Sequence, residues 1–265
     1  MSVSISNSIF IDTVSVDSVP LPNMPDIRLD KYRRLYKFLH HRDIEYLTVD
    51  ETIKINSSKV FRDEYFKMEV GNPRINDPEE GKNYNHQRHF ATEQTAQCDN
   101  SVGVFLEPFH LLSLAMGTFK EGCAAFCRPD VGLDEPYDAC VEIVDVLGFI
   151  ELIKSSALVQ NPQTYAYDLS IEGLFRAFHY HPVIYADINR VFAEDIRTFI
   201  PPAPNPYTKA LDLAQQQEFR LVFFPRQYAL KPEPIFVKLP GLARLLKVHG
   251  PDEIKRALDA GDQHH

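Results

Sequence analysis

The stretch QQQEFRLVFF, residues 215–224, decides how the C-terminal half of this chain folds. The segment TKALDLAQQQ (208–217) consists mostly of strong helix formers and predicts a helix. From Glu218 on, the residues alternate as they do in a β-strand, which predicts a core face made of Phe219, Leu221 and Phe223. Residues 215–224 therefore predict a helix–strand junction at which the strand begins with a carboxylate.

The opposite face of this predicted strand begins with two charged residues, Glu218 and Arg220. On the residues alone, the favoured interpretation is a solvated ion pair, which contributes well under ~1 kcal/mol to stability. The alternative is that both side chains face a cleft, where an ionised carboxylate stabilises a developing cation. The pattern leaves both interpretations open.

Composition limits the class of protein. The chain has 265 residues, of which 44% are hydrophobic and 25% are charged, as expected for a soluble globular protein with one large domain or two small ones. No run approaches the ~18 apolar residues of a membrane span. The first 25 residues lack a basic segment followed by a long apolar one, so no signal peptide is predicted and the expected location is cytoplasmic.

The net charge of the chain is −9, from 37 acidic and 28 basic residues. This balance argues against a protein that binds nucleic acid mainly by neutralising phosphates. A local basic groove stays compatible with it, because a net charge says little about one cleft.

Proline and polar segments divide the chain. Residues 1–25 end in VPLPNMP and predict an extended arm before a single domain at 26–265. Residues 71–89 are polar and rich in turn formers, which predicts a long surface loop. Helix and strand patterns are interleaved without a regular βαβ rhythm, so the predicted fold class is α+β.

Periodicity predicts further elements. Strands are expected at 52–58, 218–224, 234–240 and once within 139–153, and helices at 190–200 and 241–249. The segment YRRLYKFL (32–39) fits a helix and a strand equally well.

Several common signatures are absent from the sequence: GxGxxG opening a helix, GxxxxGK[ST], HExxH and GxSxG. Their absence argues against a Rossmann dehydrogenase, a P-loop ATPase, an HExxH metalloprotease and an α/β-hydrolase.

His179 and His181 would share one face of a strand, but the sequence offers no third metal ligand, so no metal site is predicted. Cys123 and Cys127 share a face if their segment is helical, and the cysteines are expected to be buried free thiols.

Motifs spread over residues 30–245 resemble a family of uncharacterised bacterial proteins. In that family a Tyr-Lys strand precedes a Ser-Ser segment, a Val-x-Tyr element and a late Glu-x-Glu-Tyr-Arg element. The matching residues here are Tyr36, Lys37, Ser57, Ser58, Phe61, Val183, Tyr185, Lys209, Glu218, Phe219 and Arg220. The chain departs from the family by lacking Asn-Asp-Pro after Phe61 and by having Gln216 in place of the first Glu.

This order of motifs looks like that of ADP-ribosyltransferases. The resemblance implies a single α+β domain with a split, mostly antiparallel small sheet flanked by helices, and NAD as the substrate. Cleavage of the nicotinamide–ribose bond passes through an oxocarbenium-like cation, which explains the need for a carboxylate.

The resemblance also implies a role for each matching residue. Glu218 would stabilise the cation, supported by Ser57 or Ser58, and Gln216 would position the acceptor. Lys37, or Arg34, would meet the pyrophosphate. Tyr36 or Tyr185 would stack on the nicotinamide, and Arg220 would line the NAD site.

The leading hypothesis is an NAD-dependent ADP-ribosyltransferase-like protein, a bacterial toxin or phage-defence effector that acts on an unknown macromolecular acceptor. The first alternative is a non-catalytic interaction protein of the same fold, an immunity or anti-defence factor that binds a protein partner. The second alternative is a metal-dependent nucleic-acid enzyme that uses His179 and His181.

Overall fold

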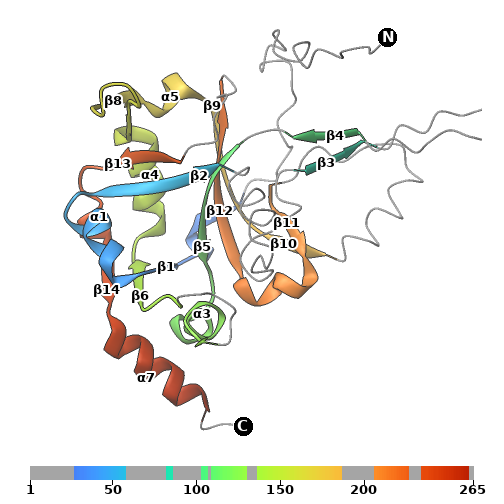
Figure 1. Cartoon of the computed structure of the whole chain (residues 1–265), viewed down its shortest axis with the longest axis vertical. Coiled ribbons are helices and arrows are strands. Elements are labelled where there is room, and N and C mark those ends of the chain that lie inside the picture. Colours follow the sequence, from blue (N-terminus) through green and yellow to red (C-terminus); the bar gives the residue numbers. More distant parts are fainter. Residues whose placement is uncertain are drawn as a thin grey trace, which may run out of the picture.

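A computed structural model of the chain describes residues 27–57, 82–85, 103–106, 109–129, 136–186, 206–226 and 234–262. These residues form a mixed structure of helices and strands, which confirms the predicted α+β class (Figure 1). The predicted arm at 1–25, the helix at 190–200 and nearly all of the loop at 71–89 lie outside the described residues.

A ten-stranded sheet dominates the described residues, and all of its pairings are antiparallel. Its main path runs β14-β6-β1-β5-β2-β13-β7-β8, and β12 joins β5 to β9. The strands of this sheet are β1 (Leu35–Leu39), β2 (Thr52–Ser57), β5 (His110–Ala115), β6 (Ala139–Ile143), β7 (Leu158–Gln160), β8 (Tyr167–Ser170), β9 (Phe175–Pro182), β12 (Glu218–Pro225), β13 (Ile235–Lys238) and β14 (Leu246–His249). The predicted antiparallel character is confirmed, but the sheet is larger than the small sheet expected.

Two small ladders complete the described strands. Strand β10 (Ile184–Ala186) pairs in parallel with β11 (Thr208–Ala210), and β3 (Lys82–Asn85) pairs antiparallel with β4 (Gly103–Leu106). The first ladder carries Tyr185 and Lys209, which both contact the start of β12.

The helices in the described residues are few and short. They are α1 (Ile44–Thr48), α3 (Phe119–Phe126), α4 (Val146–Ser156), α5 (Ile171–Leu174) and α7 (Pro251–Asp262), with 3₁₀ turns at Leu29–Lys31, His41–Asp43, Leu211–Gln216 and Ala243–Leu245. Helix α3 begins with a capping box between Thr118 and Glu121, which satisfies backbone N–H groups of its first turn. None of the helices in the described ranges is long and apolar enough to cross a membrane.

The main core lies between α4 and one face of the sheet (Figure 1). Val146, Phe149, Ile150 and Ile153 of α4 are almost fully buried against the apolar sides of β1, β2, β5, β12 and β13. The predicted core face of β12 belongs to this core, because Phe219, Leu221 and Phe223 all pack in it. Burial of each such side chain contributes roughly 1.5–3 kcal/mol.

The sheet divides at β5. On one edge of β5, Ala115 pairs with β1 while His110 and Leu111 pair with β2, so the two neighbouring strands diverge from the middle of β5. On its other edge, β5 pairs continuously with β12 from His110 to Ala115. The divergence leaves the β1–β2 edge of β5 without strand partners at 112–114, and the pocket described below lies there.

Two local predictions are wrong. Residues 208–217 form strand β11 and a 3₁₀ turn rather than one helix, because pairing with β10 overrides their helix propensity. Residues 241–249 form a 3₁₀ turn and β14, because Gly241 takes a positive φ of 93° and the following residues pair with β6. The strand predicted once within 139–153 is confirmed as β6, and most of α4 follows it in the same segment. The ambiguous segment 32–39 ends in strand β1.

Candidate active site

Glu218 is held at the first position of β12 by both flanking elements. The 3₁₀ turn Leu211–Gln216 ends just before it, and Gln217 takes a left-handed φ of 44°, which turns the chain sharply into the strand. The backbone N–H of Glu218 donates to the hydroxyl of Tyr185 at 2.9 Å. The backbone that carries the carboxylate is therefore held in place on both sides. Glu218 is only 6% exposed.

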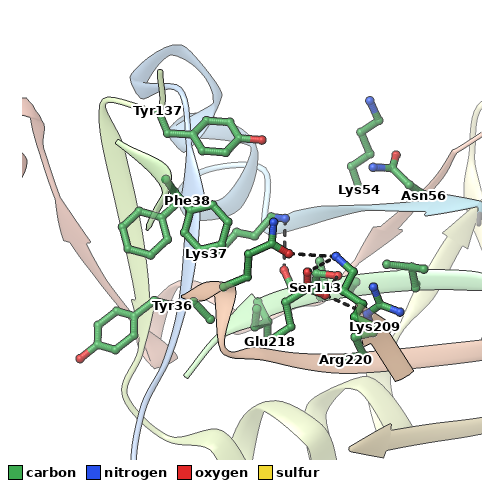
Figure 2. Close-up of a pocket in the computed structure, with 16 residues that line it drawn as sticks. Tyr36, Lys37, Phe38, Lys54, Asn56, Ser113, Tyr137, Lys209, Glu218 and Arg220 are labelled. Atoms are coloured by element: carbon green, nitrogen blue, oxygen red, sulfur yellow. Dashed lines mark hydrogen bonds and ion pairs between the residues drawn. The ribbon is translucent and has the colours of Figure 1, made fainter. Parts of the chain in front are cut away.

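Two cations and a hydroxyl hold the Glu218 carboxylate (Figure 2). Lys209 Nζ lies 2.5 Å from Oε1, Arg220 Nε lies 2.8 Å from Oε2, and Ser113 Oγ donates to Oε2 at 3.1 Å. Burial alone raises the pKa of Glu218, but the charges and hydrogen bonds of Lys209 and Arg220 outweigh it and hold this pKa below its usual value. Glu218 is consequently an ionised carboxylate inside the protein.

The favoured interpretation of Glu218 and Arg220 as a solvated ion pair is wrong. Arg220 is 1% exposed, and its guanidinium also donates to the carbonyl of Pro206. The second cation, Lys209, is 3% exposed and donates to Gln216 Oε1 at 2.9 Å. The network is buried, and Val222 and Phe224 continue the same face of β12 into a second apolar cluster.

Lys37 of β1 enters the opening beside β5. Its Nζ donates to the backbone carbonyl of Ser113 at 3.3 Å, a group that the divergence of β1 and β2 leaves without a strand partner. Burial lowers the pKa of Lys37, the charge of Glu218 raises it and that of Lys54 lowers it further. Lys37 is therefore a half-buried amine at the centre of the split in the sheet.

A pocket of about 130 Å³ lies along this split (Figure 2). Its charged lining residues are Lys37, Lys54, Lys209, Arg220 and Glu218. Other lining side chains are Tyr36, Phe38, Asn56, Phe126, Tyr137 and Gln216. Four basic groups thus face one carboxylate, in a chain whose net charge is −9.

A second cavity of about 500 Å³ continues from the first. The two cavities share Lys37, Phe38, Lys54, Asn56 and Tyr137 in their linings. The second is lined mostly by apolar side chains of α1, β1, β2 and β6 and includes Leu47, Phe236 and Leu246. The two cavities are called the cleft below: charged side chains line the smaller one, mostly apolar side chains line the larger one, and Lys37 and Lys54 line both.

The structure brings together some of the residues predicted from the sequence. Glu218, Gln216, Lys37 and Arg220 line one pocket with Tyr36, although the ring of Tyr36 points away from Glu218 and packs 6.1 Å from that of Phe119 (Figure 2). Tyr185 reaches the network only through its hydroxyl, at the backbone of Glu218.

The two predicted serines are not part of the described pocket. Ser57 is buried on the face of β2 that also carries Ile53 and Ile55, opposite Lys54 and Asn56. Ser58 lies outside the described residues. The hydroxyl that binds Glu218 comes from Ser113 instead.

Sequence reasoning missed Ser113, Lys54, Asn56 and Tyr137 and gave Lys209 no role. The alternation of 52–57 places Lys54 and Asn56 on one face of the predicted strand, so the sequence alone could have indicated that these two side chains lie together. The sequence gives no such indication for Ser113, because its position opposite Arg220 depends on the pairing of β5 with β12, more than a hundred residues apart.

His179 and His181 lie on one face of β9, as predicted. His181 Nδ1 is 2.7 Å from the carbonyl of Pro182, and the ring of His179 packs edge-on against Phe224. Burial lowers the pKa of His179. Within the described ranges, no cluster of three or more His, Cys, Asp and Glu side chains is arranged to hold a metal ion.

Cys123, Cys127 and Cys140 are buried free thiols, which confirms the prediction for these three cysteines. Cys123 and Cys140 pack with Tyr36 and Phe38 between α3 and the sheet. Burial raises the pKa of Cys140, which keeps this thiol protonated and unreactive.

Comparisons of the chain with protein-family models, with curated proteins and with solved structures find no match. The resemblance to ADP-ribosyltransferases therefore stays a prediction from the sequence.

Proposed function

We propose that the cleft binds NAD or a closely related nucleotide pyrophosphate. The observation that carries this proposal is the concentration of Lys37, Lys54, Lys209 and Arg220 around one carboxylate in an acidic chain. One of these positive charges is balanced by Glu218, so the pocket retains a surplus that favours an anion. A pyrophosphate, with two negative charges, complements that surplus.

The positions of the lysines suggest how such a ligand would lie. Lys54 is exposed and, among the described residues, forms no ion pair or hydrogen bond, so its charge is available to a phosphate. Tyr137 lines both cavities and offers an aromatic side chain to a base or to nicotinamide. The cavity of about 500 Å³ supplies apolar space on the other side of the lysines.

We further propose ADP-ribosyl transfer as the reaction, with Glu218 as the stabilising carboxylate. Loss of nicotinamide leaves positive charge on the ribose, and an ionised carboxylate in a site of low dielectric stabilises that charge. Glu218 lines the pocket, is ionised and is fixed before any ligand arrives. Gln216 lies beside it through their shared partner Lys209, where it could orient an acceptor.

Thermal denaturation with and without NAD tests binding. Ligand at 100 times its dissociation constant stabilises the folded state by about 2.7 kcal/mol, which gives a measurable rise in melting temperature. Lys54→Gln should reduce this rise, whereas Lys154→Gln, the same change of charge on the exposed side of helix α4, should leave it intact. An absent rise at millimolar NAD in the wild type would refute the binding proposal.

Incubation with labelled NAD and a cell extract tests the reaction. We expect transfer of label or loss of NAD with the wild type and neither with Glu218→Gln. If the wild type and Glu218→Gln turn over NAD equally, Glu218 has no role in the reaction, even if NAD binds. The melting curve of Glu218→Gln is needed as a control, because the substitution also disturbs a buried ion pair.

One observation favours a non-catalytic binding protein as the second candidate. Both oxygens of Glu218 already have strong partners, so a ribose hydroxyl would have to displace Ser113 or share an oxygen with a cation. In this case Glu218 keeps Lys209 and Arg220 in place for an anion and performs no chemistry. A rise in melting temperature with NAD, without turnover, is the outcome that distinguishes this candidate.

A further inference from the structure

Lys37 differs from the other two lysines of the cleft in its surroundings. Its amine donates a hydrogen bond to the backbone carbonyl of Ser113, at 3.3 Å, and none of the described carboxylates lies within ion-pair distance of it. Lys209 is bound to Glu218 and Gln216, and Lys54 extends from the exposed face of β2. Lys37 is thus the one of the three whose amine is partly desolvated without being paired to an acid.

The groups that face Lys37 act on its proton in opposite directions. Burial and the charge of Lys54 on β2 favour the neutral amine, whereas the charge of Glu218 on β12 favours the ammonium. Burial has the largest effect on the pKa of Lys37, the charge of Glu218 the second largest and the charge of Lys54 the smallest, so this pKa is lowered mainly because the amine is buried. A neutral amine keeps its hydrogen bond to the Ser113 carbonyl, since an N–H still donates.

We propose that Lys37 Nζ forms an imine with an aldehyde or ketone that also carries a phosphate group. The amine lies where the two cavities of the cleft meet, so a carbonyl carbon can approach it from either side. The phosphate of the same molecule would meet Lys54 and the cationic end of the pocket. This site goes beyond the proposed binding of NAD and does not depend on it.

The reaction balances without an oxidant or a reductant. The lone pair of Nζ adds to the carbonyl carbon, and proton transfers from nitrogen to oxygen give a carbinolamine. Loss of one water then gives the C=N bond, and protonation of its nitrogen gives an iminium ion. Desolvation and a neighbouring cation are the two conditions that activate lysines for this step, and Lys37 meets both of them.

Reductive trapping with pyridoxal 5′-phosphate tests the proposal. The full chain is mixed with less than one equivalent of the aldehyde near neutral pH, reduced with sodium borohydride, digested and mapped by mass spectrometry. A lowered pKa leaves more free amine at neutral pH, so we expect Lys37 to carry most of the label and Lys54 and Lys154 to carry little. Label spread over exposed lysines, with none at Lys37, would overturn the proposal.

Substitutions at Lys37 and Lys54 test the amine and the neighbouring charge independently. Lys37→Arg keeps the positive charge and should abolish the dominant label. Lys54→Gln removes the neighbouring charge, so trapping at Lys37 should fall at neutral pH and recover as the pH rises. Lys54→Arg should trap like the wild type, and an identical pH profile in all Lys54 variants would contradict the role of this neighbour.

A comparison of two aldehydes distinguishes the imine site from the binding of NAD. Pyridoxal without its phosphate should label Lys37 more weakly than pyridoxal 5′-phosphate, because it lacks the group that Lys54 attracts. Equal labelling by the two aldehydes would refute the phosphate requirement. If Lys37 is labelled but NAD does not raise the melting temperature, the imine site is supported and only the proposal that the cleft binds NAD is refuted.

Discussion

Two carboxylates of the large sheet, Glu218 and Glu142, are both buried but have different partners. The partners of Glu218, Lys209 and Arg220, are themselves buried and line a pocket. Glu142 on β6 is 2.7 Å from Arg34 and 3.9 Å from Lys247, whose side chains are 59% and 57% exposed. The first network encloses its charges, whereas the second is open to water on one side.

The network around Glu142 joins β6 to β14 and α7, the last two described elements of the chain. His249 Nε2 lies 2.8 Å from Glu142, and its Nδ1 lies 3.0 Å from Glu253 of α7. The ring of His249 also stacks on Phe119 at 4.3 Å. This network connects β6, β14 and α7, so a structural role accounts for it. Burial of an acid alone therefore does not mark an active site; the distinction here is the enclosed surplus of positive charge beside a cavity.

The largest expected effect on stability is that of Glu218→Gln. Removing this charge leaves Lys209 and Arg220 buried and uncompensated, which costs about 3–5 kcal/mol. Chemical denaturation at neutral pH measures the loss. The double variant Glu218→Gln, Lys209→Met should recover part of it, because it also removes one of the stranded cations.

Glu142→Gln should cost less, about 1–3 kcal/mol. Its partner Arg34 is more than half exposed and returns to water when the carboxylate is lost. Arg34→Ala is the matched control and should cost no more than ~1 kcal/mol, as for other exposed partners. A larger loss from Glu142→Gln than from Glu218→Gln would contradict the comparison of the two networks.

The smallest of the three effects is the response of Glu218 to acid. Its pKa is lowered on folding from an ordinary value of 4.5, so its contribution to stability is present above that pH and is lost as the pH falls toward the folded pKa. Between pH 4.5 and about 3.5, the wild type should lose about 1 kcal/mol more than Glu218→Gln. Denaturation curves of both proteins at the two pH values measure it; parallel losses would mean that Glu218 is not ionised in the folded state.

Local patterns predicted the regular strands and failed where distant pairing decides the structure. The alternation in 52–57 and 218–224 identified β2 and β12, together with the core face of β12. Residues 208–217 contain strong helix formers but follow β10, a partner more than twenty residues away. The same limit explains the site: Glu218 and Arg220 were visible in the sequence, but their burial depends on Lys209, Ser113 and Tyr207.

Strand β12 lies between β5 and β9, and all eight of its residues are buried. Its amide hydrogens should therefore exchange with deuterated solvent only through unfolding of the whole domain. Strands β1 and β2, where they diverge from β5, lack this enclosure. A ligand that enters the split should slow exchange in β1 and β2 and leave β12 unchanged at short labelling times, so isotope exchange can locate an occupant before its chemical identity is known.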